Sequence, residues 1–161
     1  MGTLASRHRR HFDALSLRPT PGITYSVDAD YRMIWECWRG NVTLDELESF
    51  WTALSHDEEA CAHRRTLADI RFCDPQFSSE QWIHLLDLFH LPDTPFQGWR
   101  CAIVTTEARV QQLAGQFLAY GAETVEAEIF DCPASALVWL LRGQQDAMTQ
   151  ARAAHHHRAH G

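Results

Sequence analysis

The stretch TLADIRFCDPQFSSEQW, residues 66–82, is the part of the chain from which the fold is best understood. It opens with the short apolar segment Thr66–Ile70, which is typical of a strand buried on both faces of a sheet. Arg71–Ser79 then brings charged, thiol and hydroxyl groups together, which indicates a loop. Ser78 with Gln81 forms a capping box, which predicts that a helix begins there. In alternating α/β proteins, the loop after a central strand is where ligands usually bind.

The remaining patterns place further strands and helices around this stretch. Strands are expected at Ile23–Val27, Met33–Arg39, Thr66–Ile70, Arg100–Thr105 and Val125–Phe130. Alternation in the second places Trp35 and Trp38 on opposite faces, and the alternating apolar and acidic residues of the last suit an edge strand. The run His56–Arg65 indicates a polar connection. Helices are expected after the capping residues Thr43, Ser78, Thr106 and either Asp131 or Cys132. The order β-β-α-β-α-β-α-β-α predicts an α/β fold with a mixed sheet of about five strands. The first two strands of this sheet are expected to be antiparallel and the later strands parallel, with helices packed on the sheet.

We expect one folded domain at residues 23–143. Residues 1–22 form a basic N-terminal arm, which is either a short helix on the domain or a mobile tail. Residues 144–161 form a polar, His-rich tail that we expect to be disordered. The histidines of this tail lack the fixed geometry that metal selectivity requires, so no metal site is predicted.

Charge and composition exclude several classes of function. The net charge is −7, and residues 20–142 carry 8 arginines against 19 acidic residues, so nucleic-acid binding is not expected. No apolar run approaches the roughly 18 residues that a membrane span requires. The chain has no lysine, which excludes a Walker A lysine and a Schiff base. Its five widely spaced cysteines predict reduced thiols and a cytoplasmic protein.

Polar side chains at the carboxyl ends of two neighbouring predicted strands form a candidate binding or partner surface. They are Asp69, Arg71, Cys73, Asp74, Ser78, Ser79, Thr105, Thr106 and Arg109. Helix amides near Ser78 would favour an anion there. The alternative is purely structural: Asp74 and the serines cap a helix, and Arg71 pairs with a carboxylate.

A catalytic role for this surface would need more than the sequence offers. Cys73 would require a nearby base, and neither His84 nor His90 stands at a spacing typical of a Cys–His pair. No complete catalytic motif occurs in the sequence, so we expect neither an enzyme nor a cofactor. The six tryptophans suggest core packing or, alternatively, the lining of an apolar ligand pocket or a dimer interface.

Four segments carry a resemblance to a known family. They are YSVDADYRMIWECWRGNVTLDEL (25–47), LADIRF (67–72), RCAIVTTEARVQQLAGQF (100–117) and EIFDCPASALVWL (128–140). Together they resemble the SpoIIAA-like, or STAS-like, group of small bacterial proteins. This resemblance implies the α/β fold described above and a role in signalling or protein interaction.

In the anti-sigma-factor antagonist branch of that group, an Asp-Ser-Ser-Gly segment after the third strand carries a phosphorylated serine. Here Asp74 matches the aspartate, but Pro75 and Gln76 follow it and the glycine is absent. Ser78 and Ser79 come later and are the candidate phosphoacceptors.

The sequence thus favours a non-enzymatic regulatory or protein-interaction domain of STAS-like fold. The alternative is a protein that binds a small apolar ligand, and the third hypothesis is an enzyme that uses Cys73 or Asp74. The expected partner is a protein or a small apolar ligand, and homodimer formation stays open.

Overall fold

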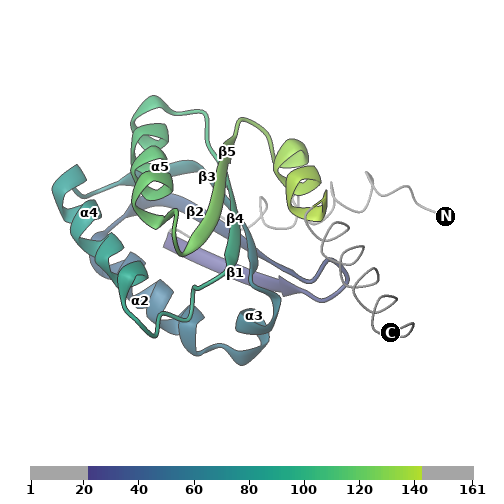
Figure 1. Cartoon of the computed structure of the whole chain (residues 1–161). Helices are drawn as coiled ribbons and strands as arrows, with labels where there is room; N and C mark the ends of the chain where they lie inside the picture. Colours follow the sequence, from purple (N-terminus) through teal and green to yellow (C-terminus); the bar gives the residue numbers. More distant parts are fainter. Residues whose placement is uncertain (1–21, 143–161) are drawn as a thin grey trace, which may run out of the picture.

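A five-stranded mixed sheet forms the centre of the molecule in this computed structural model, which describes residues 22–142 (Figure 1). Its strands are β1 (Gly22–Asp28), β2 (Met33–Val42), β3 (Arg65–Pro75), β4 (Trp99–Val104) and β5 (Val125–Phe130). They lie side by side in sequence order, β1 antiparallel to β2 and all later pairs parallel. The mixed α/β sheet predicted from the sequence is confirmed, and β5 lies at an edge as expected.

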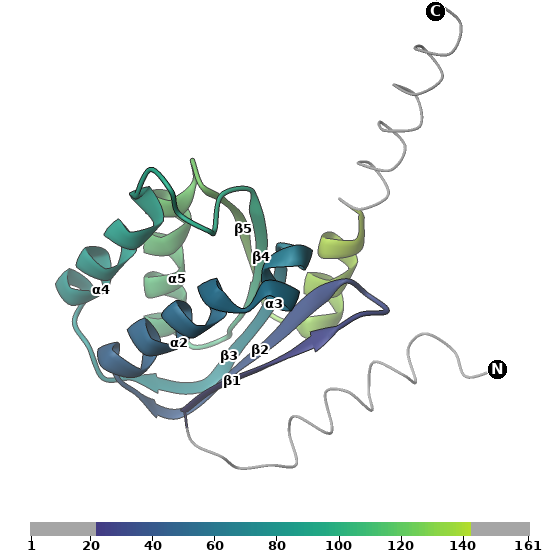
Figure 2. The same cartoon turned by 90° about the horizontal axis from the view of Figure 1, so that it is seen from below.

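Helices cover the two faces of this sheet unequally. The helical elements are α2 (Leu44–His56), α3 (Glu58–His63), α4 (Ser79–Leu86), the 3₁₀ turn η1 (Asp87–His90), α5 (Ala108–Gly121) and a last helix at residues 133–142. Figure 2 shows α2, α4 and α5 on one face and helix 133–142 on the other. Because each parallel strand is added on the same side of the previous one, right-handed crossovers place every connecting helix on one face.

Both predicted capping boxes are present. Thr43 accepts a hydrogen bond from the Glu46 amide at the start of α2, and the Glu46 carboxylate accepts one from the Thr43 amide. Ser78 and Gln81 make the same exchange at the start of α4. These side chains satisfy backbone donors that have no partner within their helices, which fixes where each helix begins.

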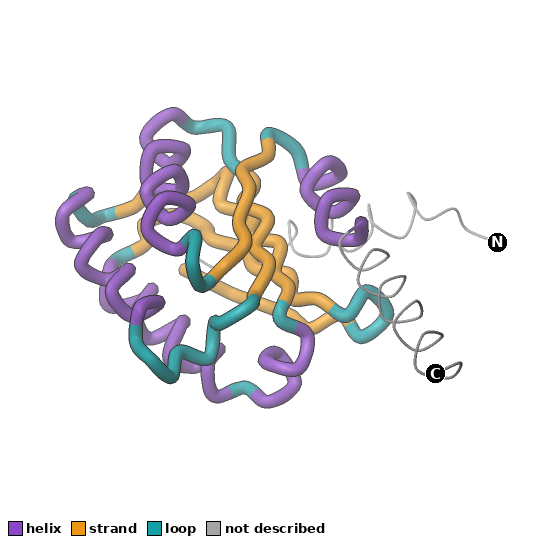
Figure 3. The backbone as a smooth tube through the Cα atoms, viewed as in Figure 1, coloured by secondary structure: helices purple, strands orange, loops and turns teal. Residues whose placement is uncertain are grey.

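Three parts of the chain differ from the prediction. Glu107, not Thr106, caps α5, because its carboxylate accepts a hydrogen bond from the Val110 amide. β3 continues through Pro75, and β2 continues through Val42, so Cys73 and Asp74 pair with Gly40 and Asn41 inside the sheet. The register between β2 and β3 shifts after Cys37, and the two strands then continue to pair up to Val42 and Pro75. This extension of β3 leaves a loop of only three residues, 76–78, before α4. The predicted polar connection at residues 56–65 contains a short helix, α3, as the tube view of Figure 3 shows.

The sheet separates two hydrophobic clusters. The larger cluster lies between the sheet and α2, α4 and α5, and the smaller one lies beneath helix 133–142. Alternation along β2 divides its side chains between them: Ile34 and Trp38 join the larger cluster, whereas Met33 and Trp35 join the smaller. The predicted placement of Trp35 and Trp38 on opposite faces is therefore confirmed. The predicted arm, apart from Gly22, and the predicted tail lie outside the described residues.

Candidate functional site

The polar residues predicted as a binding surface divide into separate local groups. Asp69 is buried and accepts two hydrogen bonds from the Arg71 guanidinium, at 2.8 and 2.7 Å. Asp74 meets Arg109 of α5 at 3.5 Å on the exposed surface. Arg109 also donates to the Phe77 carbonyl at 3.3 Å, so it ties α5 to the segment after β3. The Arg71–Asp69 pair agrees with the structural alternative, whereas Asp74 pairs with Arg109 and does not cap α4.

The hydroxyl groups of the predicted surface are also dispersed. Ser78 caps α4, and Ser79 is the first residue of that helix. Thr105 is fully buried, and its hydroxyl has no hydrogen-bond partner among the described residues. Thr106 is exposed. None of the predicted surface residues is among the described residues that line the apolar cavity between the sheet and helices α2, α4 and α5.

Burial of Cys73 bears on the hypothesis of a cysteine nucleophile. Its thiol contacts the Ile70 carbonyl at 3.3 Å, and burial raises the pKa of Cys73 to about 12. At neutral pH the thiolate fraction is then very small, and the thiolate is the nucleophilic form. The geometry gives no support to an enzyme that uses Cys73.

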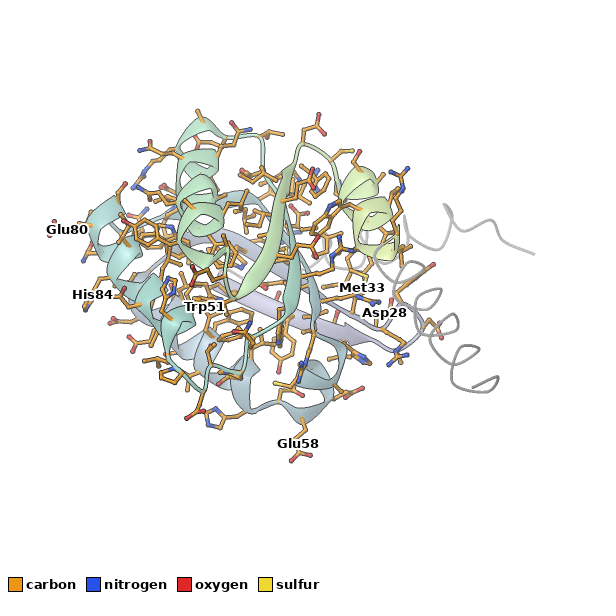
Figure 4. The ribbon with its side chains drawn as sticks, viewed as in Figure 1. Asp28, Met33, Trp51, Glu58, Glu80 and His84 are labelled. Atoms are coloured by element: carbon orange, nitrogen blue, oxygen red, sulfur yellow. The ribbon has the colours of Figure 1, made fainter. Side chains whose placement is uncertain are left out.

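A cavity of about 70 Å³, partly open to the surface, lies within the larger hydrophobic cluster, between strands β2 to β5 and helices α2, α4 and α5. Four of the six tryptophans of the chain line it: Trp38, Trp51, Trp82 and Trp99. In Figure 4, Trp51 lies among the enclosed side chains, whereas Glu80 and His84 of α4 point outward. These four tryptophans also belong to the larger hydrophobic cluster, so they take part in core packing as well as in lining the cavity.

The aromatic rings around the cavity contact one another as well as the cavity space. Trp51 lies 5.6 Å from Trp82 and 4.8 Å from Phe89, measured between ring centroids. Phe96 lies 5.3 Å from Trp99 and 4.8 Å from Phe89. Pairs at such distances stabilise one another beyond the burial of their area. The rings therefore form a connected aromatic wall that spans α2, α4, η1 and the start of β4.

One carboxyl group interrupts this apolar lining. Glu36 of β2 is only 5% exposed, and its side chain lines the cavity. Its two oxygens accept hydrogen bonds from the Trp38 indole and from the Thr66 hydroxyl. Burial raises the pKa of Glu36 to about 7, although both hydrogen bonds act in the opposite direction. Glu36 is the only carboxyl group among the described residues that line the cavity.

Cys101 adds a second weakly polar group to the same wall. It pairs in register with Thr66 on the neighbouring strand β3 and also lines the cavity. Burial, reinforced by Glu36, raises the pKa of the Cys101 thiol well above its ordinary value. Cys101 therefore behaves as a neutral, slightly polar core residue beside the carboxyl group.

Sequence reasoning did not identify Glu36 as a site residue, although a signal was present. In the run MIWECWR, residues 33–39, Glu36 shares its face with Ile34 and Trp38. A carboxyl group on the apolar face of a strand is a candidate for function because burying it is costly. Only the position of the strand inside the sheet shows that this face is fully covered.

Among the described residues 22–142, no group of three or more His, Cys, Asp or Glu side chains is arranged to hold a metal ion. No helix in this part of the chain is both long and apolar enough to cross a membrane. The His-rich tail lies outside this range.

Comparison with solved structures finds similarity to an uncharacterised protein of the DUF3478 family with a SpoIIAA-like fold, from Shewanella loihica PV-4. The match covers 76% of this chain and 97% of that chain, at 20% sequence identity and a TM-score of 0.49. No protein-family model and no curated protein matches this chain.

Proposed function

We propose that this domain binds a small, largely apolar ligand in the cavity between the sheet and helices α2, α4 and α5. The observation that carries the proposal is the cavity of about 70 Å³ with its aromatic wall. Protein interiors are close-packed, and they contain few voids larger than a water molecule. Atoms that line a void lose dispersion contacts on that side, and a ligand of fitting shape restores them.

The volume limits the size of the ligand. An apolar cavity of about 150 Å³ is enough to bind benzene, so a cavity of half that volume suits a smaller or slender molecule. A larger ligand would require the aromatic side chains at the wall to turn. The apolar lining favours a hydrocarbon body with at most one polar group, because each unpaired polar group would lose its hydration.

The indole signals of the tryptophans provide a direct test by ¹⁵N NMR. Xenon and 1-butanol should shift the signals of Trp38, Trp51, Trp82 and Trp99 more than those of Trp35 and Trp139, which lie on the other face. Ala68→Val narrows the cavity from β3 and should abolish these shifts. The matched control Ala53→Val changes an exposed residue of α2 and should leave them intact. Equal shifts at all six indoles, unaffected by Ala68→Val, would reject the proposal.

A separate observation favours protein interaction as a second function. Phe72 of β3 is 55% exposed, and the guanidinium groups of Arg71 and Arg39 lie 5.0 and 5.5 Å from its ring centre. Exposed aromatic and arginine side chains are enriched at the centres of protein interfaces. The test is to capture partner proteins from the source cell with the wild type and with Phe72→Ser. If both capture the same partners in equal amounts, the result counts against this surface.

A further inference from the structure

We infer that the ligand of the cavity is a small apolar amine whose ammonium group pairs with the carboxylate of Glu36. The inference rests on the proposed ligand-binding function and specifies the chemical class of the ligand. It follows from the position of Glu36, from the absence of a basic group among the described residues around it, and from the aromatic character of the walls.

Glu36 is placed to receive a cation. Its side chain lines the cavity, and each of its oxygens accepts one hydrogen bond from the protein, from Trp38 and from Thr66 respectively. A carboxylate has about four lone-pair sites, so both oxygens retain acceptor capacity. An ionised carboxylate in an apolar interior is costly unless a charge of opposite sign accompanies it. Among the described lining residues there is no arginine or histidine to supply that charge.

The rest of the wall favours a cation over an anion. The indole N–H groups of Trp82 and Trp99 donate to the main-chain carbonyls of Leu113 and Pro95, so they are not free to bind a ligand carboxylate. The faces of aromatic rings attract cations, and the attraction grows when water is excluded. An ammonium group would therefore find a carboxylate and ring faces, whereas an anion would meet the carboxylate of Glu36.

Amine binding should depend on the ionisation of Glu36. Of the groups that face Glu36, Trp38 and Thr66 do not titrate near neutral pH, and Cys101 of β4 has a raised pKa. The described cavity residues of α2, α4 and α5 are all apolar or aromatic. When the pKa of Glu36 is about 7, pairing with an ammonium group at lower pH releases the Glu36 proton to solvent. Affinity should then rise about tenfold from pH 6 to pH 8.

The experiment compares three four-carbon probes: n-butylamine, 1-butanol and butyrate. Binding is followed by NMR through the indole signal of Trp38, which donates to Glu36. For the wild type at pH 8, n-butylamine should bind at least about tenfold more tightly than 1-butanol, because a charge-assisted hydrogen bond is stronger than a neutral one. Butyrate should bind most weakly.

Glu36→Gln keeps the shape of the side chain but removes the negative charge. It should reduce the affinity for n-butylamine below that for 1-butanol at pH 8, because the ammonium group would then be buried without a charge of opposite sign. Glu128→Gln, at an exposed site on β5, is the matched control and should change nothing. Equal affinities of n-butylamine and 1-butanol in the wild type would overturn the inference and leave the apolar cavity function intact. If n-butylamine, 1-butanol and xenon all fail to bind, the proposed function itself is overturned.

The pH profile of the wild type tests the same inference without any substitution, so it serves even if Glu36→Gln does not fold. An affinity for n-butylamine that rises about tenfold from pH 6 to pH 8, while that for 1-butanol does not rise, would support pairing with Glu36. An affinity for n-butylamine that is the same at both pH values would overturn it.

Discussion

Glu36 combines two properties at the level of a single residue. It lies between apolar neighbours on a strand, and its carboxyl group is held inside the domain by Trp38 and Thr66. Desolvation favours the neutral form of such a group, whereas its hydrogen bonds favour the ionised form, and desolvation has the larger effect here. The residue is therefore poised to change its charge close to neutral pH.

This property predicts how stability changes with pH. The pKa of Glu36 is about 7 in the folded protein, against an ordinary value of 4.5. The folded state thus binds more protons than the unfolded state between these values, so Glu36 makes the free energy of unfolding fall as pH rises from 4.5 to 7. The expected loss is about 3 kcal/mol. Urea denaturation at pH 4.5 and pH 8 should show this loss in the wild type relative to Glu36→Gln.

Carboxylates with lowered pKa values, such as Asp57 and Glu46, act in the opposite direction. They are present in both proteins, so their effect cancels in the comparison. The same pH dependence in the wild type and Glu36→Gln would show that Glu36 ionises normally in the folded protein.

At the scale of a single element, pairing with β2 turns the carboxyl end of β3 from the predicted loop into strand. Residues 71–75 have a loop-like composition, yet they continue the strand because Gly40–Val42 of β2 extends alongside them. The Gln76 amide then donates to the Val42 carbonyl at 2.8 Å, which closes the ladder. The functional loop expected from the sequence is thereby reduced to the short connection before α4. Ser78 ends this connection, and Ser79 follows it.

The two serines should differ in their effect on stability. Ser78→Ala removes the side chain that accepts from the Gln81 amide, and it should lower the free energy of unfolding by about 1 kcal/mol. Ser79→Ala is the matched control, since Ser79 follows the cap as the first helical residue, and it should change stability by less than about 0.5 kcal/mol. Chemical denaturation measures both, and equal effects would contradict a specific capping role for Ser78.

At the scale of the whole molecule, the sheet separates the cavity from a smaller core. The connecting helices enclose the aromatic cavity, while helix 133–142 alone covers Met33, Trp35 and Leu67 among the described residues. Arg100 ties this helix to the sheet, since its guanidinium lies 4.0 Å from the ring centre of Trp139. Stability on this face therefore depends on a few apolar side chains of one helix.

Leu137 should be one of these side chains. It is 2% exposed in the smaller core, so Leu137→Ala should lower the free energy of unfolding by about 2–5 kcal/mol. Its neighbour Val138 is 48% exposed on the same helix, and Val138→Ala should cost less than about 1 kcal/mol. Because the cavity lies on the other face, both variants should bind 1-butanol normally whenever they are folded. Similar losses for the two variants would show that helix 133–142 is not anchored through Leu137.

The sequence by itself determined the succession of strands along the chain, both capping boxes and the division of Trp35 and Trp38 between two faces. These features depend on neighbours within a few residues of each other, through alternation and local hydrogen bonds. Only the tertiary structure decided where β3 ends, because that depends on pairing with β2, about thirty residues earlier in the chain. It also decided that Glu36 lines an aromatic cavity, because side chains from strands and helices distant in sequence surround it and bury its carboxyl group.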